Sequence, residues 1–153
     1  MENLDELDTM IIQQLMQDSR IQYRKLVELT GKSLGTVSNR IQRLQDLGII
    51  KHWTVLVDPE KIGFDLTVLI NIQIDVKFLD TVNEHLSGIP ELVAIYNITG
   101  EFDITAIARV RSRRHLDAVI HRILETDHIR RTSSNVVLRI LKENFRLQME
   151  EKQ

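Results

Sequence analysis

The sequence contains no cysteine, only two prolines among 153 residues, and no long apolar run. The absence of cysteine excludes disulfides, thiolate metal ligands and cysteine nucleophiles. A membrane-spanning helix requires about 18 consecutive apolar residues, which this chain lacks. The first eight residues, MENLDELD, are acidic where a signal peptide is basic and then apolar. We therefore expect a cytoplasmic protein with no membrane partner, whose stability depends on packing and subunit association.

Charge is distributed unevenly along the chain. The net charge of −2 argues against a nucleic-acid partner, because neutralising phosphates requires lysine and arginine. Residues 19–45, however, contain one acidic residue, Glu28, and six basic ones: Arg20, Arg24, Lys25, Lys32, Arg40 and Arg43. Scattered surface charges often mark nothing more than a solvated helix surface. The fold of this segment decides between the two interpretations.

Three short helices are predicted in the first 50 residues. Apolar residues at helical spacing indicate a helix over residues 5–17, and a second, shorter helix ends at Gly31. Ser33 can cap a third helix, which ends at Gly48. The tight turn between the second and third helices is typical of a helix-turn-helix.

The third predicted helix has a polar face opposite its apolar stripe. Thr36, Asn39 and Arg43 lie on that face. An amide can pair with adenine, a guanidinium with guanine, and a hydroxyl with either base, so these residue types suit base reading. Arg40 lies nearer the apolar edge, where it is better placed to hold a phosphate or a carboxylate of its own domain. The alternative is that any amphipathic helix has a polar face.

A β-prone stretch follows the third helix. Residues 49–57 are rich in β-branched and aromatic residues and end at the turn signal Asp58-Pro59. We interpret this stretch as the wing of a winged helix-turn-helix and the start of a linker. Trp53, the single tryptophan, is predicted to pack the joint between two domains, and stacking on DNA is the alternative.

The rest of the chain alternates between strand and helix patterns. Residues 66–76 alternate apolar and polar with a period of two, which is a strong strand signal. The complete pattern is βαββαβ, with strands over 66–76, 92–99, 104–111 and 135–142 and helices over 79–87 and 114–124. This order is typical of a ferredoxin-like α+β domain, an antiparallel sheet with its helices on one side.

The helix-free face of that sheet is predicted to be apolar. Val93, Ile95, Ile107, Val137 and Leu141 are assigned to it. Because such a face is unfavourable in water, we expect a second subunit to cover it.

Several ungapped motifs, in order from end to end, resemble the Lrp/AsnC family of bacterial and archaeal "feast and famine" regulators. They are LDELDTMIIQQL, TGKSLGTVSNRIQRLQDLGII, VDPEKIGF, GEFD and RTSSNVVLRIL. The resemblance implies a winged helix-turn-helix over residues 1–52, a wing end and linker over 53–64, and a ferredoxin-like, RAM-type dimerisation and effector-binding domain over 65–153.

Partners and DNA-contact residues are also implied by the resemblance. Lrp/AsnC proteins form dimers that often assemble into tetramers, octamers or larger rings, and they bind double-stranded promoter DNA. The third helix corresponds to the recognition helix, and the implied DNA contacts are Ser33, Thr36, Ser38, Asn39, Arg40 and Arg43.

Amino acids or related metabolites bind between subunits in many family members. The implied effector residues are Gly100 and Asp103 in one turn, and Thr132, Ser133, Ser134 and Asn135 near the start of the last predicted strand. The chemistry is suitable, because a ligand carboxylate needs donors and its ammonium needs an acceptor such as Asp103. The alternative is that Gly100 and Asp103 form a plain hairpin turn.

Two other functions compete with a regulator. Siroheme decarboxylases share the two-domain architecture, but their wing region reads like Arg-Arg-Phe-Gly-Ala with a histidine just beyond. This chain has IKHWTVLVDP there and no such histidine after His52. Its five histidines show no metal-ligand spacing, so we expect no metal, no cofactor, no catalytic residues and no enzymatic activity. A metabolite-binding or assembly protein that does not read DNA is the second alternative, and salt-dependent DNA binding distinguishes it from a regulator.

Overall fold

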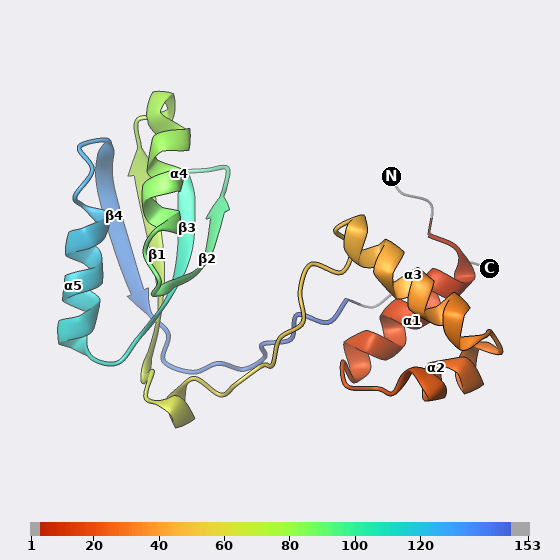
Figure 1. The fold of residues 1–153 in the computed structure, drawn as a ribbon. Coiled ribbons are helices and arrows are strands. Elements are labelled where there is room, and N and C mark those ends of the chain that lie inside the picture. Colours follow the sequence, from red (N-terminus) through yellow and green to blue (C-terminus); the bar gives the residue numbers. More distant parts are fainter. Residues whose placement is uncertain (1–3, 148–153) are drawn as a thin grey trace. The chain divides into compact units, whose positions relative to one another are not determined.

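A computed structural model describes residues 4–147 and divides the chain into two compact units (Figure 1). The first comprises residues 4–55 and 142–147, and the second comprises residues 56–141. Each unit has its own cluster of buried apolar side chains, so the chain has two separate hydrophobic cores.

The first unit contains the three predicted helices, α1 (Glu6–Gln17), α2 (Tyr23–Thr30) and α3 (Leu34–Asp46). Gly31 ends α2 in the left-handed conformation that favours glycine, with φ of +65°. The three helices enclose the first core, which consists of Ile11, Leu15, Leu26, Val37, Ile41 and Leu44. The helical prediction for this region is therefore confirmed (Figure 1).

The predicted wing strand is wrong. No residue between 49 and 57 is in a strand, and the side chains of Val55 and Leu56 are each 75% exposed. The stretch has a high β-propensity, but a strand also requires a partner for its backbone N–H and C=O groups. Within residues 4–147 this stretch has no strand partner. A short 3-10 helix, η1 (Glu60–Ile62), follows it.

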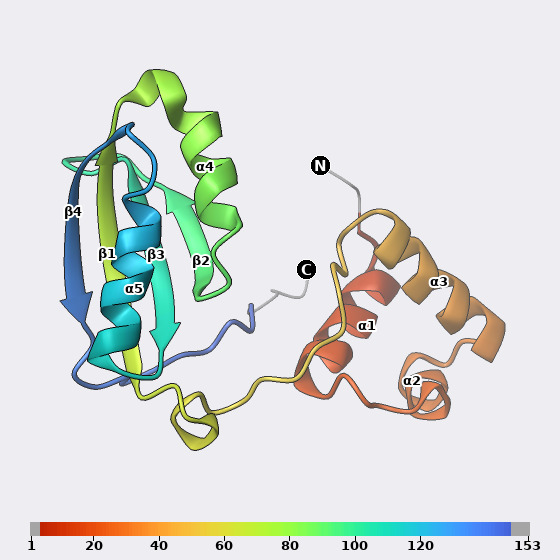
Figure 2. The same ribbon diagram turned by 60° about the vertical axis from the view of Figure 1, so that its left-hand side comes forward.

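The second unit is a four-stranded antiparallel sheet covered on one face by two helices (Figure 2). Its elements are β1 (Leu66–Ile74), the 3-10 helix η2 (Val76–Phe78), α4 (Leu79–Ser87), β2 (Leu92–Asn97), β3 (Ile104–Val110), α5 (Arg113–Ile123) and β4 (Ile129–Val136). The strand order is β2-β3-β1-β4, with all three pairs antiparallel. This is the predicted ferredoxin-like α+β arrangement.

Alternation along the two central strands builds the second core. β1 buries every second side chain from Val68 to Ile74, and β3 buries every second one from Ile104 to Val110. The register places Ile70 opposite Ala106, so the buried residues of both strands share the helix-covered face. The opposite face is called the open face below.

The last strand lies six residues earlier than predicted. β4 covers Ile129–Val136, not 135–142, and pairs with β1 along its length. The prediction followed the apolar run VVLRIL, yet Leu138 within that run is 98% exposed. An edge strand pairs with one neighbour and leaves its other side open to water, so it tolerates polar side chains and needs little apolar periodicity. The more polar segment before the run therefore forms the strand.

The open face is more polar than predicted. Ile95 does not belong to it, because Ile95 lies opposite Ala106 and packs into the helix-covered core, and Leu141 lies beyond the end of β4. Hydroxyl and amide groups occupy the centre of this face, where Thr105 donates a hydrogen bond to Asn71 over 2.6 Å. The open face therefore carries hydrogen-bonded polar side chains among its apolar ones.

A charged cluster fixes α5 to the turn before β2. Glu91 accepts a hydrogen bond from Nε2 of His115 at 2.8 Å and forms an ion pair with Nη2 of Arg122 at 2.5 Å. The backbone N–H of Arg111 donates to Nδ1 of His115, which leaves Nε2 as the protonated nitrogen. Burial raises the pKa of Glu91, but the His115 and Arg122 interactions outweigh it, so the pKa of this carboxyl lies below its ordinary value.

Glu91→Gln is expected to reduce the acid sensitivity of the second unit. A depressed pKa contributes stability above the unfolded pKa of 4.5, and that stability is lost as pH falls through the folded pKa. At pH 7 the free energy of unfolding of the variant should be about 1.5 kcal/mol lower than that of the wild type. This is the lower end of the range for a hydrogen bond to a charged group, because Arg122 is partly exposed. Chemical denaturation between pH 3 and 7 measures this, with exposed Glu84→Gln as the control. A pH profile parallel to that of the wild type would contradict it.

Candidate nucleic-acid interface and ligand site

The helix α3 is preceded by a tight turn and is capped by a hydroxyl network. Ser33 is the N-cap residue, and its Oγ accepts a hydrogen bond from the backbone N–H of Thr36 at 3.1 Å. The two hydroxyl oxygens of Ser33 and Thr36 are 2.9 Å apart, so these side chains also bond to each other. Both predicted contact residues therefore lie at the exposed first turn of α3, where backbone N–H groups and the helix dipole favour an anion such as phosphate.

The exposed face of α3 presents uncommitted polar side chains. Ser38 and Asn39 are exposed, and within residues 4–147 no hydrogen bond holds either side chain. Gln42, one turn beyond Asn39, is also exposed and donates from Nε2 to Asp46 at 2.8 Å. Sequence reasoning did not select Gln42, although its spacing of three from Asn39 places both amides on one face. These amides offer the donor and acceptor pair that adenine requires.

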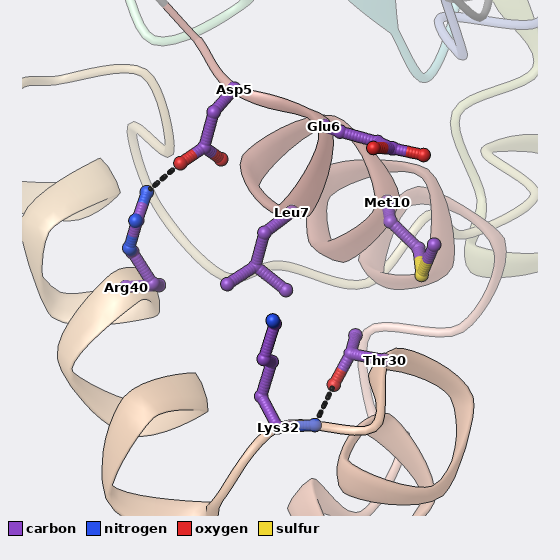
Figure 3. A pocket seen from close by; sticks show the side chains of 7 residues that line it. All are labelled: Asp5, Glu6, Leu7, Met10, Thr30, Lys32 and Arg40. Atoms are coloured by element: carbon purple, nitrogen blue, oxygen red, sulfur yellow. Dashed lines mark hydrogen bonds and ion pairs between the residues drawn. The ribbon is translucent and has the colours of Figure 1, made fainter.

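The two arginines of α3 lie on its flank toward α1. Nη1 of Arg40 is 2.6 Å from Oδ2 of Asp5 and 3.1 Å from Oδ1 of Asp8, and Nη1 of Arg43 is 3.0 Å from Oδ2 of Asp8. Figure 3 shows the guanidinium of Arg40 directed at Asp5. Arg40 was predicted to hold either a phosphate or a carboxylate of its own domain, and in the structure it holds the carboxylates of Asp5 and Asp8. Arg43, predicted to read a base, also has an intradomain carboxylate partner.

Two groups in this cluster, Asp5 and Arg40, have pKa values shifted toward their ionised forms. The hydrogen bond from the backbone N–H of Asp8, together with the Arg40 guanidinium, holds the pKa of the Asp5 carboxyl below its ordinary value. Hydrogen bonds to Asp5 and Asp8 raise the pKa of Arg40. Two carboxylates thus face two guanidiniums, and the cluster carries no net charge.

The excess positive charge read from the sequence is largely compensated in space. Lys25 pairs with Glu28 at 3.0 Å, and the carboxylates that pair with Arg40 and Arg43 come from outside residues 19–45. Lys32 lines an open pocket of about 420 Å³ that contains side chains of both charges (Figure 3). The other lining residues are Asp5, Glu6, Leu7, Met10, Thr30 and Arg40.

In the second unit, the Gly100 turn holds Asp103 at the end of β1. Gly100 has φ of +125°, a conformation that other residues rarely adopt. Oδ2 of Asp103 accepts a hydrogen bond from the backbone N–H of Ile74 at 2.9 Å. The backbone N–H and C=O of Asp103 bond to Ile72 and Ile98. Asp103 is therefore half-buried, bonded at two points to β1 and at one point to the residue that follows β2.

The four predicted effector residues of β4 alternate between faces. Ser133 and Asn135 lie opposite Asn71 and Leu69, on the open face. Thr132 and Ser134 lie opposite buried residues of β1, on the helix-covered face, so the four do not converge on one site within the chain.

An ion pair of 3.0 Å between Glu101 and Arg131 joins the Gly100 turn to the start of β4. The guanidinium of Arg131 also lies 5.5 Å from the ring centroid of Phe102. Sequence reasoning missed Arg131, because no local pattern links two residues that are 30 positions apart.

The geometry of the two units agrees with their separate matches to known families. Residues 67–147 match the family model of the Lrp/AsnC ligand binding domain, and residues 4–51 match that of a winged helix-turn-helix DNA-binding domain. The chain belongs to the Lrp/AsnC family. It is a transcription regulator with a DNA-binding domain followed by a ligand-binding domain, as the sequence predicted.

Relatives of this Lrp/AsnC protein align with it along nearly its whole length. An uncharacterised HTH-type transcriptional regulator of Pyrococcus furiosus is 35% identical over 95% of this chain and 98% of its own. The HTH-type transcriptional regulator LrpA of Mycobacterium tuberculosis is 29% identical over 90% of this chain and 91% of its own.

Solved structures show the same fold. The structure of Escherichia coli AsnC superimposes with a TM-score of 0.84 at 28% identity, covering 92% of this chain and 96% of that chain. The feast or famine regulatory protein of M. tuberculosis, complexed with L-methionine, gives a TM-score of 0.87 at 27% identity, covering 95% and 99%.

Residues 4–147 contain no group of three or more histidine, cysteine or acidic side chains that could hold a metal ion. None of the helices described is long and apolar enough to cross a membrane.

Proposed function

We propose that this Lrp/AsnC protein binds operator DNA sequence-specifically through α3, and that an amino acid captured by the second unit changes this binding. The observation that carries the first part is the exposed face of α3, where polar side chains stay uncommitted while its arginines are fixed by carboxylates. A helix with such a face fits the major groove and can read base edges there.

The predicted DNA contacts divide into two roles by their surroundings. Asn39 and Ser38, with Gln42 added, face outward and are assigned to base edges. Ser33 and Thr36 occupy the first turn and are assigned to the phosphate backbone.

Arg40 and Arg43 each use Nη1 for a carboxylate, and their side chains are 32% and 41% exposed. A guanidinium has five N–H donors, so each arginine keeps others for a base or a phosphate beside the reading face.

The amino-acid proposal rests on Asp103 and on the neighbouring open face. The M. tuberculosis protein was crystallised with L-methionine, an amino acid whose ammonium requires an acceptor. Asp103 supplies a fixed carboxylate for the ammonium. Ser133 and Asn135 pair with β1 three and five residues away from Ile74, so in a site between subunits we assign their donors to the ligand carboxylate from a neighbouring copy of the chain. Gly100 gives the turn its shape, while Thr132 and Ser134 face the helices and are assigned no contact in the same site.

Self-association completes the proposed mechanism. The open face carries Leu69, 37% exposed, and Ile107 among its polar pairs, a mixture that suits contact with another copy of the chain. Assembly into dimers, tetramers or octamers would set the distance between recognition helices. That distance determines the spacing of the DNA half-sites that the protein can bind together. A ligand that alters assembly would thereby alter operator choice.

The two other functions are less well supported. A siroheme-decarboxylase-like enzyme requires catalytic groups, whereas the relatives named above are transcriptional regulators. An assembly protein that does not read DNA would have no use for an exposed amide face on α3. Titration with a porphyrin would expose the enzyme through a new absorption band, and salt-insensitive or absent DNA binding would favour the assembly protein.

Asn39→Ala is expected to reduce affinity for the operator by about 1 to 3 kcal/mol, roughly 5- to 150-fold, because an amide paired with adenine is lost. The operator comes from selecting fragments of the source genome with the wild-type protein at one fixed salt concentration, with and without amino acids. Binding of the variant is then measured on the selected fragment and on a random duplex.

Gln17→Ala is the matched control, because it removes an exposed amide from α1 instead of α3. It should bind both duplexes like the wild type. Failure of the wild-type selection to enrich any palindromic site would refute DNA reading itself. Equal losses on the operator and the random duplex would move Asn39 from base reading to backbone contact.

A further inference from the structure

Asp8 occupies an unusual position between α1 and α3. It is 1% exposed, and among residues 4–147 it is the one charged side chain that is fully buried. Its Oδ1 accepts from Nη1 of Arg40 at 3.1 Å, and its Oδ2 accepts from Nη1 of Arg43 at 3.0 Å. One buried carboxylate therefore holds both arginines of the recognition helix, and these pairs join residues 32 and 35 positions apart.

The carboxylate of Asp8 is itself fixed to the start of α1. Its Oδ2 also accepts from the backbone N–H of Asp5 at 3.3 Å, and the side chain of Asp5 accepts from the backbone N–H of Asp8 at 2.8 Å. These reciprocal bonds form a capping box. Because the capping box fixes the Asp8 carboxylate to the start of α1, this carboxylate stays in place if the side chains of Arg40 and Arg43 turn toward DNA.

Stability alone is a weak reason for such a cluster. Removing charges from water is costly, and well-packed apolar residues of similar volume are often as stabilising as a buried ion pair. The cluster has a clearer consequence for the surface of α3. It keeps two cations beside the reading face in one geometry and cancels their charge.

We propose that Asp8 is a positioning residue for sequence discrimination, acting on DNA through Arg40 and Arg43. With Asp8 present, the two guanidiniums stay on the flank of α3, and DNA affinity depends on the match between bases and the exposed face. Without its charge, Arg43 loses its carboxylate partner and is free to bind phosphates of any sequence, while Arg40 keeps only its pair with Asp5. Operator preference then falls. This inference rests on the proposed reading of DNA by α3.

The test compares the full-length wild type with Asp8→Asn on the selected operator fragment and on a random duplex of equal length, by fluorescence anisotropy over a series of salt concentrations. Asparagine keeps the shape of the side chain but removes its charge. On the random duplex, log affinity against log salt should steepen by about 0.9 for each arginine that gains a phosphate. The ratio of operator to random affinity should fall about tenfold, as for the loss of one good base contact.

Asp18→Asn is the control for net charge. Asp18 lies at the C-terminal end of α1, 3.8 Å from an arginine, Arg20, that is already 91% exposed. The substitution changes the net charge of the chain by the same amount as Asp8→Asn, yet it leaves the cluster at α3 intact. Both the salt slope and the affinity ratio should therefore match those of the wild type.

A purely structural role would give another pattern. A loosened helical unit would bind both duplexes more weakly, with no steeper salt slope, and that result in a folded Asp8→Asn protein would overturn the proposal. Asp5→Asn covers the case in which Asp8→Asn does not fold, because Asp5 is half-exposed and contacts only Arg40 of the two arginines. It removes the shorter pair of Arg40 but leaves Arg40 paired with Asp8 at 3.1 Å, so it should steepen the salt slope by less than Asp8→Asn does.

The operator and random-duplex measurements test the proposed function and this inference separately. A wild type without operator preference would refute DNA reading by α3. The random-duplex arm needs no operator, and an unchanged salt slope in both variants would overturn the inference even if DNA reading holds.

Discussion

Ile41→Ala is expected to unfold the helical unit and abolish DNA binding while the sheet unit stays folded. Ile41 lies in α3, is 1% exposed and belongs to the six-residue core of the three helices. Truncating a buried isoleucine to alanine costs about 2 to 5 kcal/mol. A single core of this size rarely provides more than about 3 to 5 kcal/mol, so the loss is comparable with the whole stability of the unit.

Differential scanning calorimetry measures the effect, because two separate cores should give two transitions. Ile41→Ala should remove or strongly lower the transition of the helical unit. The matched control is Ile70→Ala, in the core of the sheet unit and fully buried, which should lower the other transition instead. A single transition that shifts equally in both variants would show that the units unfold as one.

The parts of the fold predicted correctly were those with strong local signals. The helices α1 to α3 follow from apolar residues at helical spacing and from end signals such as Ser33 and Gly31. The strand β1 follows from its strict alternation. In each case the pattern within about ten residues specifies both the element and its buried face.

The errors arose where pairing overrides local pattern. The β-prone stretch at 49–57 forms no strand, and β4 uses polar residues in preference to the more apolar run that follows. The same limit applies to the open face, where the pairing of Ile95 with Ala106 reverses the predicted face. A one-residue change of register moves a side chain to the other side of a sheet, and the chain between two strands does not encode that register.

The candidate DNA interface was predicted in position but not in its electrostatics. Acidic residues at the start of a helix are favoured by the helix dipole alone, so Asp5 and Asp8 at the start of α1 do not by themselves indicate a partner elsewhere in the chain. That these two residues reach Arg40 and Arg43 follows only from the packing of α1 against α3. Counting charges along the chain therefore overstated the positive charge of this surface.

The largest functional effect in the second unit is expected for Asp103→Asn. The side chain of Asp103 has two roles that this substitution separates, because an asparagine oxygen can still accept the hydrogen bond from the backbone N–H of Ile74. The turn should keep its shape, while the negative charge proposed to hold the ammonium of an amino acid is lost. A hydrogen bond to a charged group contributes about 1.5 to 3 kcal/mol, so amino-acid affinity should fall about 10- to 150-fold.

Isothermal titration with L-methionine, followed by other amino acids, measures this loss. Asp75→Asn is the matched control, because it removes one negative charge just beyond β1, where Asp75 pairs with Arg130 at 3.4 Å. It should bind amino acids like the wild type. Unchanged affinity in Asp103→Asn would mean that Asp103 only shapes the turn, which was the alternative for Gly100 and Asp103 from the start. A wild type that binds no amino acid would remove the effector from the mechanism and leave DNA reading by α3 untouched, because the two functions reside in separate cores.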